Sequence, residues 1–167
     1  MEIYRVTSES EAWKRKAYDS IRVDAFCYGQ NIPVEIEFSD DDVEDDFNGI
    51  LVVDDHKPIA GLKIVYPNEN TAKIERVCTV REEQKSGYGR KMISAAEEWI
   101  KEKGISHIVI SSQDRARGFY EKCGYTYNPD VSPNVYKVQP KKEKKKENKP
   151  KVEFHPDFVC VLVEKHI

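Results

Sequence analysis

Residues 82–104 read EEQKSGYGRKMISAAEEWIKEKG, and this stretch decides how the rest of the chain is interpreted. Its second half repeats apolar residues at intervals of three and four from Met92 to Ile100, which predicts an amphipathic helix that ends at Gly104. Its first half places two glycines directly before that helix. The first backbone N–H groups of a helix lack partners within the helix and lie at the positive end of its dipole. The stretch therefore predicts an anion-binding turn.

The residues of this turn suit a phosphate-bearing ligand. Glycine lets a phosphate approach the backbone, and polar or cationic neighbours offer donors around it. The candidates are Gln84, Lys85, Ser86, Gly87, Tyr88, Gly89 and Arg90. A nucleoside-triphosphate loop needs four residues between its glycines and then Gly-Lys-Ser/Thr, and a dinucleotide-binding turn needs a third glycine, so neither matches. A plain strand-to-helix turn or a site for the diphosphate of another cofactor remains.

The chain around the turn alternates between strand and helix patterns. Ser8 and Glu11 have capping-box spacing before a helical run, and residues 54–58 form a predicted hairpin turn. Strands are expected at 2–6, 49–53, 59–66, 72–80, 105–111, 125–128 and 158–164, and a short helix at 114–122. We expect one α/β domain over residues 1–167 with a mixed, mostly antiparallel central sheet flanked by helices.

Length and composition set limits on the class of protein. A chain of 167 residues is close to the usual size of one domain. The N-terminus lacks the pattern of a secretory signal and the apolar runs are strand-sized, so we expect a cytoplasmic protein that makes no membrane contact. The cysteines at 27, 78, 123 and 160 are far apart with no CxxC pair, which predicts reduced thiols and no metal site.

Two stretches concentrate charge. Residues 35–46 hold eight carboxylates, and residues 141–151 hold seven Lys and two Glu. Solvated loops account for both, because like charges repel and seldom pack. The acidic stretch could instead attract a cationic amine. The Lys-rich stretch has no interleaved aromatic residue to stack on bases, so we expect no nucleic-acid partner and a flexible insertion at about 137–152.

Three motifs together resemble one family. QKSGYG at 84–89 is similar to the Q/R-x-x-G-x-G/A pyrophosphate loop of the GNAT acetyltransferase superfamily. QDRARGFYEKCGY at 113–125 resembles that family's later motif, N/Q-x-x-A-x-x-F-Y-E-K-x-G-F. FCYGQNIPVEIE at 26–37 resembles a segment of the small bacterial ElaA/YjcF-like branch, F-V-x-E-Q-x-V-P-x-E-x-E. The likeness covers residues 3–128, and Lys85 stands where the loop usually has Gly.

This resemblance implies an acetyl-CoA-dependent N-acyltransferase whose strands splay apart at the cofactor cleft. Val77, Cys78 and Thr79 would bond the pantetheine arm through their backbone as an added strand does. The turn at 84–90 would hold the pyrophosphate, and Gln113 matches an amide position close to coenzyme A in relatives, with helix N-capping as its alternative role. Tyr120 matches the family's general acid, although it could be only a packed aromatic residue.

The base that removes the amine proton is open between several candidates. Glu75 lies on the strand before the loop, Glu35 and Glu37 are rivals, and a water chain to bulk solvent is a further alternative. The expected reaction is direct attack of a primary amine of a small molecule or basic peptide on acetyl-CoA in a ternary complex. The alternative is a non-catalytic acyl-CoA-binding module. Pairing of sheet edges into a homodimer is common for such domains.

Overall fold

The computed structural model describes residues 1–38, 46–84, 86–138 and 153–167. Its centre is a seven-stranded sheet in the order β1-β2-β3-β4-β5-β7-β6. The strands are β1 (Glu2–Thr7), β2 (Asn48–Asp54), β3 (Lys57–Asn68), β4 (Thr71–Thr79), β5 (His107–Gln113), β6 (Thr126–Tyr127) and β7 (Cys160–His166). In the described part of the chain β4 and β5 pair in parallel, and the other strand pairings are antiparallel. The predicted mixed, mostly antiparallel α/β sheet is confirmed.

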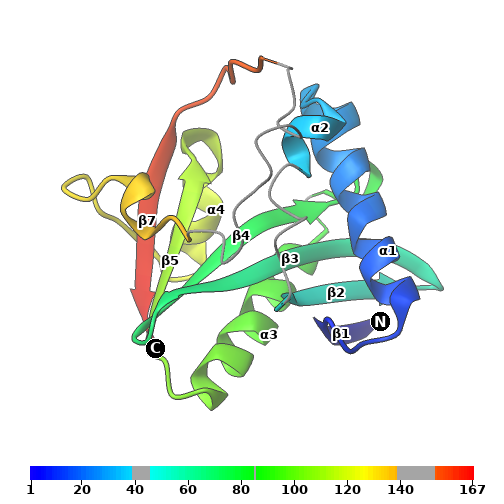
Figure 1. The fold of residues 1–167 in the computed structure, drawn as a ribbon, viewed down its shortest axis with the longest axis horizontal. Helices are drawn as coiled ribbons and strands as arrows, with labels where there is room; N and C mark the ends of the chain where they lie inside the picture. Colours follow the sequence, from blue (N-terminus) through cyan, green and yellow to red (C-terminus); the bar gives the residue numbers. More distant parts are fainter. Residues whose placement is uncertain (39–45, 85, 139–152) are drawn as a thin grey trace.

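Helices cover both faces of this sheet (Figure 1). α1 (Ala12–Arg22) packs on β3 and β4 and continues through a π-helical segment (Val23–Tyr28) to α2 (Val34–Glu37). α3 (Tyr88–Glu102) packs on β2, β3 and β4 from the other face, and α4 (Arg117–Lys122) lies at the β6–β7 side. This arrangement makes three layers with the sheet in the middle.

Each face of the sheet has its own apolar core. Strand β2 shows the reason, because Ile50 and Val52 join the cluster under α3, whereas the residue between them, Leu51, joins the cluster under α1. Side chains of a strand alternate between faces, so a continuous apolar run supplies both layers. The helical repeat of α3 buries Met92, Ile93, Ala96, Trp99 and Ile100 as predicted.

Local details differ from the sequence-based expectations. The Ser8–Glu11 capping box is wrong, because α1 begins at Ala12 and no side chain caps it. The hairpin of β2 and β3 is confirmed but tighter than predicted. Asp55 and His56 form its two-residue turn, both with positive φ (50° and 61°), as a type I′ turn requires. Predicted strands 105–111 and 158–164 begin two residues later as β5 and β7.

The expectations about membrane contact and about the two charged stretches can be compared with the structure only in part. Among the described residues, no helix is long and apolar enough to cross a membrane. The insertion predicted at about 137–152 falls almost wholly on residues 139–152, which lie outside the described part of the chain. Most of the acidic stretch at 35–46 lies outside it as well.

Candidate active site

The parallel pairing between β4 and β5 stops halfway along both strands. It runs from Thr71 opposite His107 to Ile74 opposite Ile110. Beyond that point β5 pairs only with β7, as far as Gln113 opposite Cys160. Within the described residues, no strand pairs with the β5-facing edge of Val77, Cys78 and Thr79. Figure 1 shows the two strands diverging, which leaves an edge that can bond an extended ligand.

A β-bulge at Arg76 explains why the strands diverge. Cys78 pairs with Gly61 and Glu75 with Lys63, so β4 has one residue more than β3 in this interval. Arg76 adopts φ of 50°, and its carbonyl accepts a hydrogen bond from the Tyr18 hydroxyl at 3.1 Å. A bulge bends its strand and increases the local twist. The extra residue thus turns the end of β4 away from β5.

The bulge also exchanges the two faces of β4. Before it, Ala72 and Ile74 belong to the core under α3. After it, Val77 packs against that core, whereas Cys78 belongs to the core under α1. An unbroken strand would have kept Ile74 and Cys78 on one face. Burial among apolar neighbours raises the pKa of the Cys78 thiol far above its usual value, so this sulfur remains protonated.

The predicted anion turn lies directly after β4, between a 3₁₀ turn (Arg81–Glu83) and α3. Gly87 is the N-cap of α3 with φ of 85°, a left-handed conformation that favours glycine, and a Cβ there would have open space around it. Gln84 donates to the Thr79 carbonyl at 3.4 Å, and Ser86 lies within 3.5 Å of Glu83. Lys85 lies outside the described residues.

The electrostatics of the α3 N-terminus favour an anion. Among the described residues, no side chain caps this end, and no acidic residue occupies its first turn. Arg90 lies in that first turn, where a cation is normally unfavourable because it faces the positive end of the helix dipole. A negatively charged ligand at the N-terminus would offset this repulsion and accept the unpaired N–H groups.

Two side chains of the turn have contacts that the sequence did not reveal. The Tyr88 hydroxyl donates to the Asp54 carboxylate at 2.6 Å, so its side chain is directed to the β2–β3 hairpin. A Cβ at Gly89 would lie 2.9 Å from the Phe119 ring of α4. Packing of Phe119 therefore requires the smallest residue at position 89, whether or not a phosphate is present. Because the Tyr88 side chain is bound to Asp54, Tyr88 can reach a phosphate only through its backbone.

Tyr120 lies on α4 in the core under α3 and is only 6% exposed. Burial raises the pKa of its phenol well above the usual value, and the Cys123 and Cys78 thiols add to the shift. Cys78 belongs to β4, so the phenol lies within electrostatic reach of the diverging end of that strand. The group is packed and at the same time protonated, as a general acid must be.

The candidate bases have different surroundings. Glu75 pairs with the nearly buried Lys73 at 2.8 Å and remains partly exposed. Glu37 is buried, and its carboxylate accepts from Arg22 at 3.0 Å and lies 3.4 Å from Arg76. It is therefore no part of a solvated acidic surface and is held by two cations. Glu35, on the same short helix, is exposed.

Gln113 ends β5 and makes contacts with two residues that the sequence did not single out. Its amide donates to Gln30 Oε1 at 2.9 Å, and Arg115 donates to its carbonyl oxygen at 2.8 Å. Gln113 occupies the N-cap position of the following 3₁₀ turn, but its side chain makes no capping hydrogen bond there. The branch motif at residues 26–37 contains Gln30, and that motif was the available signal. This network joins the end of the π-helical segment to the end of β5.

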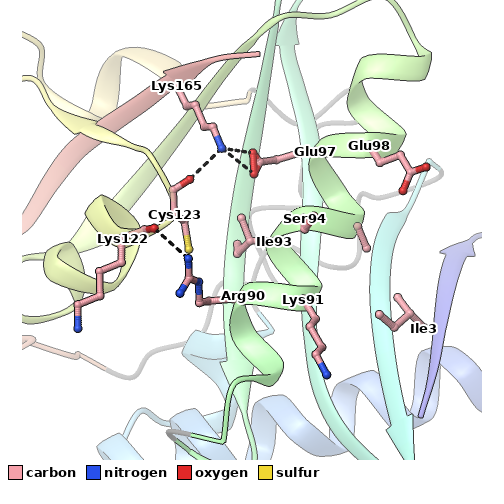
Figure 2. Close-up of a pocket in the computed structure, with 11 residues that line it drawn as sticks. Ile3, Arg90, Lys91, Ile93, Ser94, Glu97, Glu98, Lys122, Cys123 and Lys165 are labelled. Atoms are coloured by element: carbon pink, nitrogen blue, oxygen red, sulfur yellow. Dashed lines mark hydrogen bonds and ion pairs between the residues drawn. The ribbon is translucent and has the colours of Figure 1, made fainter.

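An open pocket of about 570 Å³ lies beside α3 (Figure 2). Arg90 reaches from α3 to the Lys122 carbonyl at 3.4 Å, and Lys165 pairs with Glu97. Of the described residues that were predicted to bind cofactor, only Arg90 lines it. This pocket is therefore on the outer side of α3 and is separate from the diverging strands.

Sequence comparisons agree with the motifs. The family model described as acetyltransferase (GNAT) family matches residues 10–125. A Bacillus subtilis protein named as an acetyltransferase is 32% identical over 75% of this chain and 83% of its own. The N-acetyltransferase YjcF of the same organism is 30% identical over 63% of this chain and 73% of its own.

Solved structures share the fold at low sequence identity. An N-acetyltransferase from Lactobacillus plantarum has a TM-score of 0.73 at 23% identity, with 99% of each chain covered. Escherichia coli ElaA has a TM-score of 0.72 at 16% identity, also over 99% of each chain. A GNAT acetyltransferase from Elizabethkingia anophelis, solved with acetyl-CoA bound, has a TM-score of 0.66 at 14% identity over 99% of this chain and 97% of its own.

Proposed function

Because this chain belongs to the acetyltransferase (GNAT) family, we propose that it transfers an acetyl group from acetyl-CoA directly to a primary amine. The observation that carries the proposal is the juxtaposition of an unpaired β4 edge with the uncapped N-terminus of α3. The β4 edge offers backbone groups to an extended amide-bearing arm, and the N-terminus of α3 offers N–H groups to a diphosphate. Coenzyme A joins these two chemical features in one molecule.

In this proposal the pyrophosphate lies on the backbone of residues 84–90 and the pantetheine arm runs along Val77, Cys78 and Thr79. Gln113, at the end of β5, lies on the opposite side of the opening. Arg90 supplies positive charge to the phosphates from the first turn of α3. The backbone N–H of Thr79 or its neighbour donates to the oxyanion, and loss of such a donor typically costs about 3 kcal/mol in the transition state.

The transfer follows from the chemistry of a thioester. A neutral amine attacks the carbonyl carbon, the new C–N bond forms, the C–S bond breaks, and the amine proton leaves to Glu75 or to water. Tyr120 donates its proton to the departing coenzyme A sulfur and is reprotonated from solvent. A covalent acetyl-cysteine on β4 does not fit this site, because the buried Cys78 thiol has a raised pKa and is a poor nucleophile.

The acceptor is proposed by charge. The acidic residues at 35–46 favour a cationic amine such as a polyamine, an amino sugar or a basic peptide. Of these residues, Glu35 and Asp46 are described and exposed, whereas Glu37 is turned inward to Arg22. We also propose that two chains pair through a sheet edge to form a homodimer, and sedimentation of the purified protein tests this pairing.

A non-catalytic acyl-CoA-binding module is the second candidate. One observation favours it, since the Glu75 carboxylate is already engaged by Lys73 at 2.8 Å and no longer free to take a proton without disturbing that pair. The two candidates share the cofactor site and differ only in turnover.

The test separates cofactor binding from turnover. Calorimetry with acetyl-CoA should show saturable binding to one site per chain, and a panel of polyamines, amino sugars and lysine peptides should release free coenzyme A thiol above background. Binding without thiol release from any amine supports the module. An absence of saturable binding contradicts both candidates.

A further inference from the structure

Three potential metal ligands meet at the end of the sheet that is remote from the diverging strands. His107 begins β5, and Glu164 and His166 lie at the end of β7. Their ligand atoms all lie within 4.8 Å of one another. Figure 1 shows this end of β7 beside the start of β5, next to the C-terminus.

The strand register brings the three side chains to one face. His107 is paired directly with His166 across the antiparallel β5–β7 ladder, and Glu164 precedes His166 by two residues. Residues two apart on a strand share a face, and directly paired residues share it too. The two imidazole rings are stacked with centroids 4.7 Å apart and planes 9° apart. The neighbours of His107 on β5, Ile108 and Ile110, face the α3 core, so the cluster faces the other way.

His107 has one nitrogen bound and one nitrogen free for a ligand role. Its Nδ1 lies 3.2 Å from the Thr71 hydroxyl on the adjacent strand β4. Its Nε2 is buried and makes no hydrogen bond to any described residue, and Glu164 Oε2 is 3.8 Å away. A buried polar atom without a partner is uncommon in folded proteins and calls for a specific explanation.

We propose that His107, Glu164 and His166 bind a divalent transition-metal ion of the zinc class. Two imidazoles and one carboxylate form a recurrent zinc ligand set, and the exposed His166 leaves a fourth position to water. With Nδ1–H donating to Thr71, Nε2 of His107 presents its lone pair to the ion, the usual arrangement of a ligating histidine. Ligand atoms at bond lengths of about 2.1 Å are roughly 3.4 Å apart in a tetrahedron, so the three atoms must move closer. Because each nitrogen lone pair lies in its ring plane, binding also requires one imidazole to turn out of the stacked arrangement, and the exposed His166 is the ring that turns.

The surroundings are compatible with a cation. Lys73, the next residue of β4 on the face that carries Thr71, pairs with Glu75, which lies farther along the strand and away from the cluster. Asn128 reaches Glu164 Oε2 at 3.5 Å, and the Tyr136 ring lies edge-on to His107 with centroids 6.0 Å apart. The carboxylate and one imidazole are thus held in place by neighbours on other segments.

The position of the site gives it a role separate from acetyl transfer. His107 and Gln113 are at opposite ends of β5, six residues and about 20 Å apart. An ion here would tie the last strand to the middle of the sheet without touching the cofactor. The inference therefore stands independently of the proposed reaction.

The experiment titrates Zn²⁺ into the metal-free 167-residue protein, followed by calorimetry and by thermal unfolding, and repeats the titration with Co²⁺ as a spectroscopic probe. We expect one ion per chain, a higher unfolding midpoint, and a Co²⁺ spectrum without thiolate charge-transfer bands. H166Q and E164Q should each weaken binding at least tenfold. T71V should weaken it about 10- to 100-fold, while T71S retains it.

The matched control is the double variant H56N/H155Q, which removes the other two histidines of the chain and should bind zinc as the wild type does. H166Q alters an exposed residue near the chain end, so a folding defect is not expected to obscure its result. Equal affinity in H166Q and wild type, thiolate bands in the Co²⁺ spectrum, or no saturable binding would each overturn the proposal and leave the cluster as an ordinary histidine–glutamate pair.

Discussion

The Arg22 guanidinium donates to the Glu37 carboxylate at 3.0 Å, and the side chains of both residues are almost completely buried (1% and 2% exposed). Arg22 also donates to the Glu37 backbone carbonyl at 2.9 Å. This pair fastens the short helix α2 to the end of α1, and Arg76 at the β4 bulge joins it from the sheet. A buried charge that loses its partner is costly, because it cannot regain its hydration.

We expect E37A to destabilise the protein by about 3–5 kcal/mol, because the change leaves Arg22 buried without its main carboxylate partner. Urea denaturation of the purified variant measures the loss. E35A, on the same short helix but exposed, should change stability by less than about 0.5 kcal/mol. Equal effects of the two variants would mean that the pair contributes little.

Gly89 should respond to alanine in opposite ways in two backgrounds. In the wild type, the new methyl group meets Phe119 at 2.9 Å, and we expect a loss of about 1–3 kcal/mol. In an F119L background the clash is removed, and alanine should stabilise the helix by up to about 1 kcal/mol. A double-mutant cycle measured by denaturation gives the coupling, and additive effects would contradict the contact.

Y120F should lower kcat by about 10²- to 10⁴-fold, since the variant has no proton for the departing sulfur. Affinity for acetyl-CoA, measured by calorimetry, should remain at the wild-type value. Burial raises the pKa of Tyr120, so this group stays protonated and should add no falling limb to the pH–rate profile near pH 10. Y125F is the control, because Tyr125 is buried beside Tyr120 with ring centroids 6.2 Å apart. A wild-type rate for Y120F would exclude the acid role.

E75Q tests the candidate base. If Glu75 takes the amine proton, kcat/KM should fall by about 10²-fold or more, and the acid limb of its pH profile should change. E69Q, an exposed glutamate in the β3–β4 turn, should keep the wild-type rate. Denaturation of E75Q is measured in parallel, because the change also removes the partner of Lys73. An unchanged rate in a folded E75Q protein would exclude Glu75 and leave proton removal to water or to a rival carboxylate such as Glu35.

The Tyr88–Asp54 hydrogen bond predicts how stability depends on acid pH. The bond from Tyr88 lowers the pKa of Asp54, and the same bond raises the pKa of Tyr88 to about 12. A carboxyl whose pKa is lowered in the folded state stabilises the fold at pH values above its ordinary pKa of 3.8. This contribution is lost as the pH falls through the folded-state pKa.

Y88F should therefore flatten the dependence of unfolding free energy on pH between about pH 2 and about pH 5, because Asp54 regains a more ordinary pKa. Denaturation across this range compares the variant with wild type. Y28F, at an exposed tyrosine, should retain the wild-type slope. An identical slope in Y88F would show that the bond does not hold in solution.

The sequence alone determined the features that depend on short-range chemistry. Periodicity predicted α3, the β-branched runs predicted the sheet, and the two glycines before α3 predicted the turn in which Gly87 has positive φ. The spaced motifs at 84–89 and 113–125 predicted the family. Each of these signals lies within a few consecutive residues, where backbone preference and side-chain spacing act directly.

Tertiary structure decided what depends on segments far apart in the chain. The bulge at Arg76 has no local signature, yet it separates β4 from β5 and exchanges the faces of Val77 and Cys78. Glu37 is buried because it pairs with Arg22, and a glycine is needed at position 89 because the Phe119 ring packs against it. Strand register and packing between distant segments set these contacts. A local sequence pattern does not specify which distant residue will pack against it.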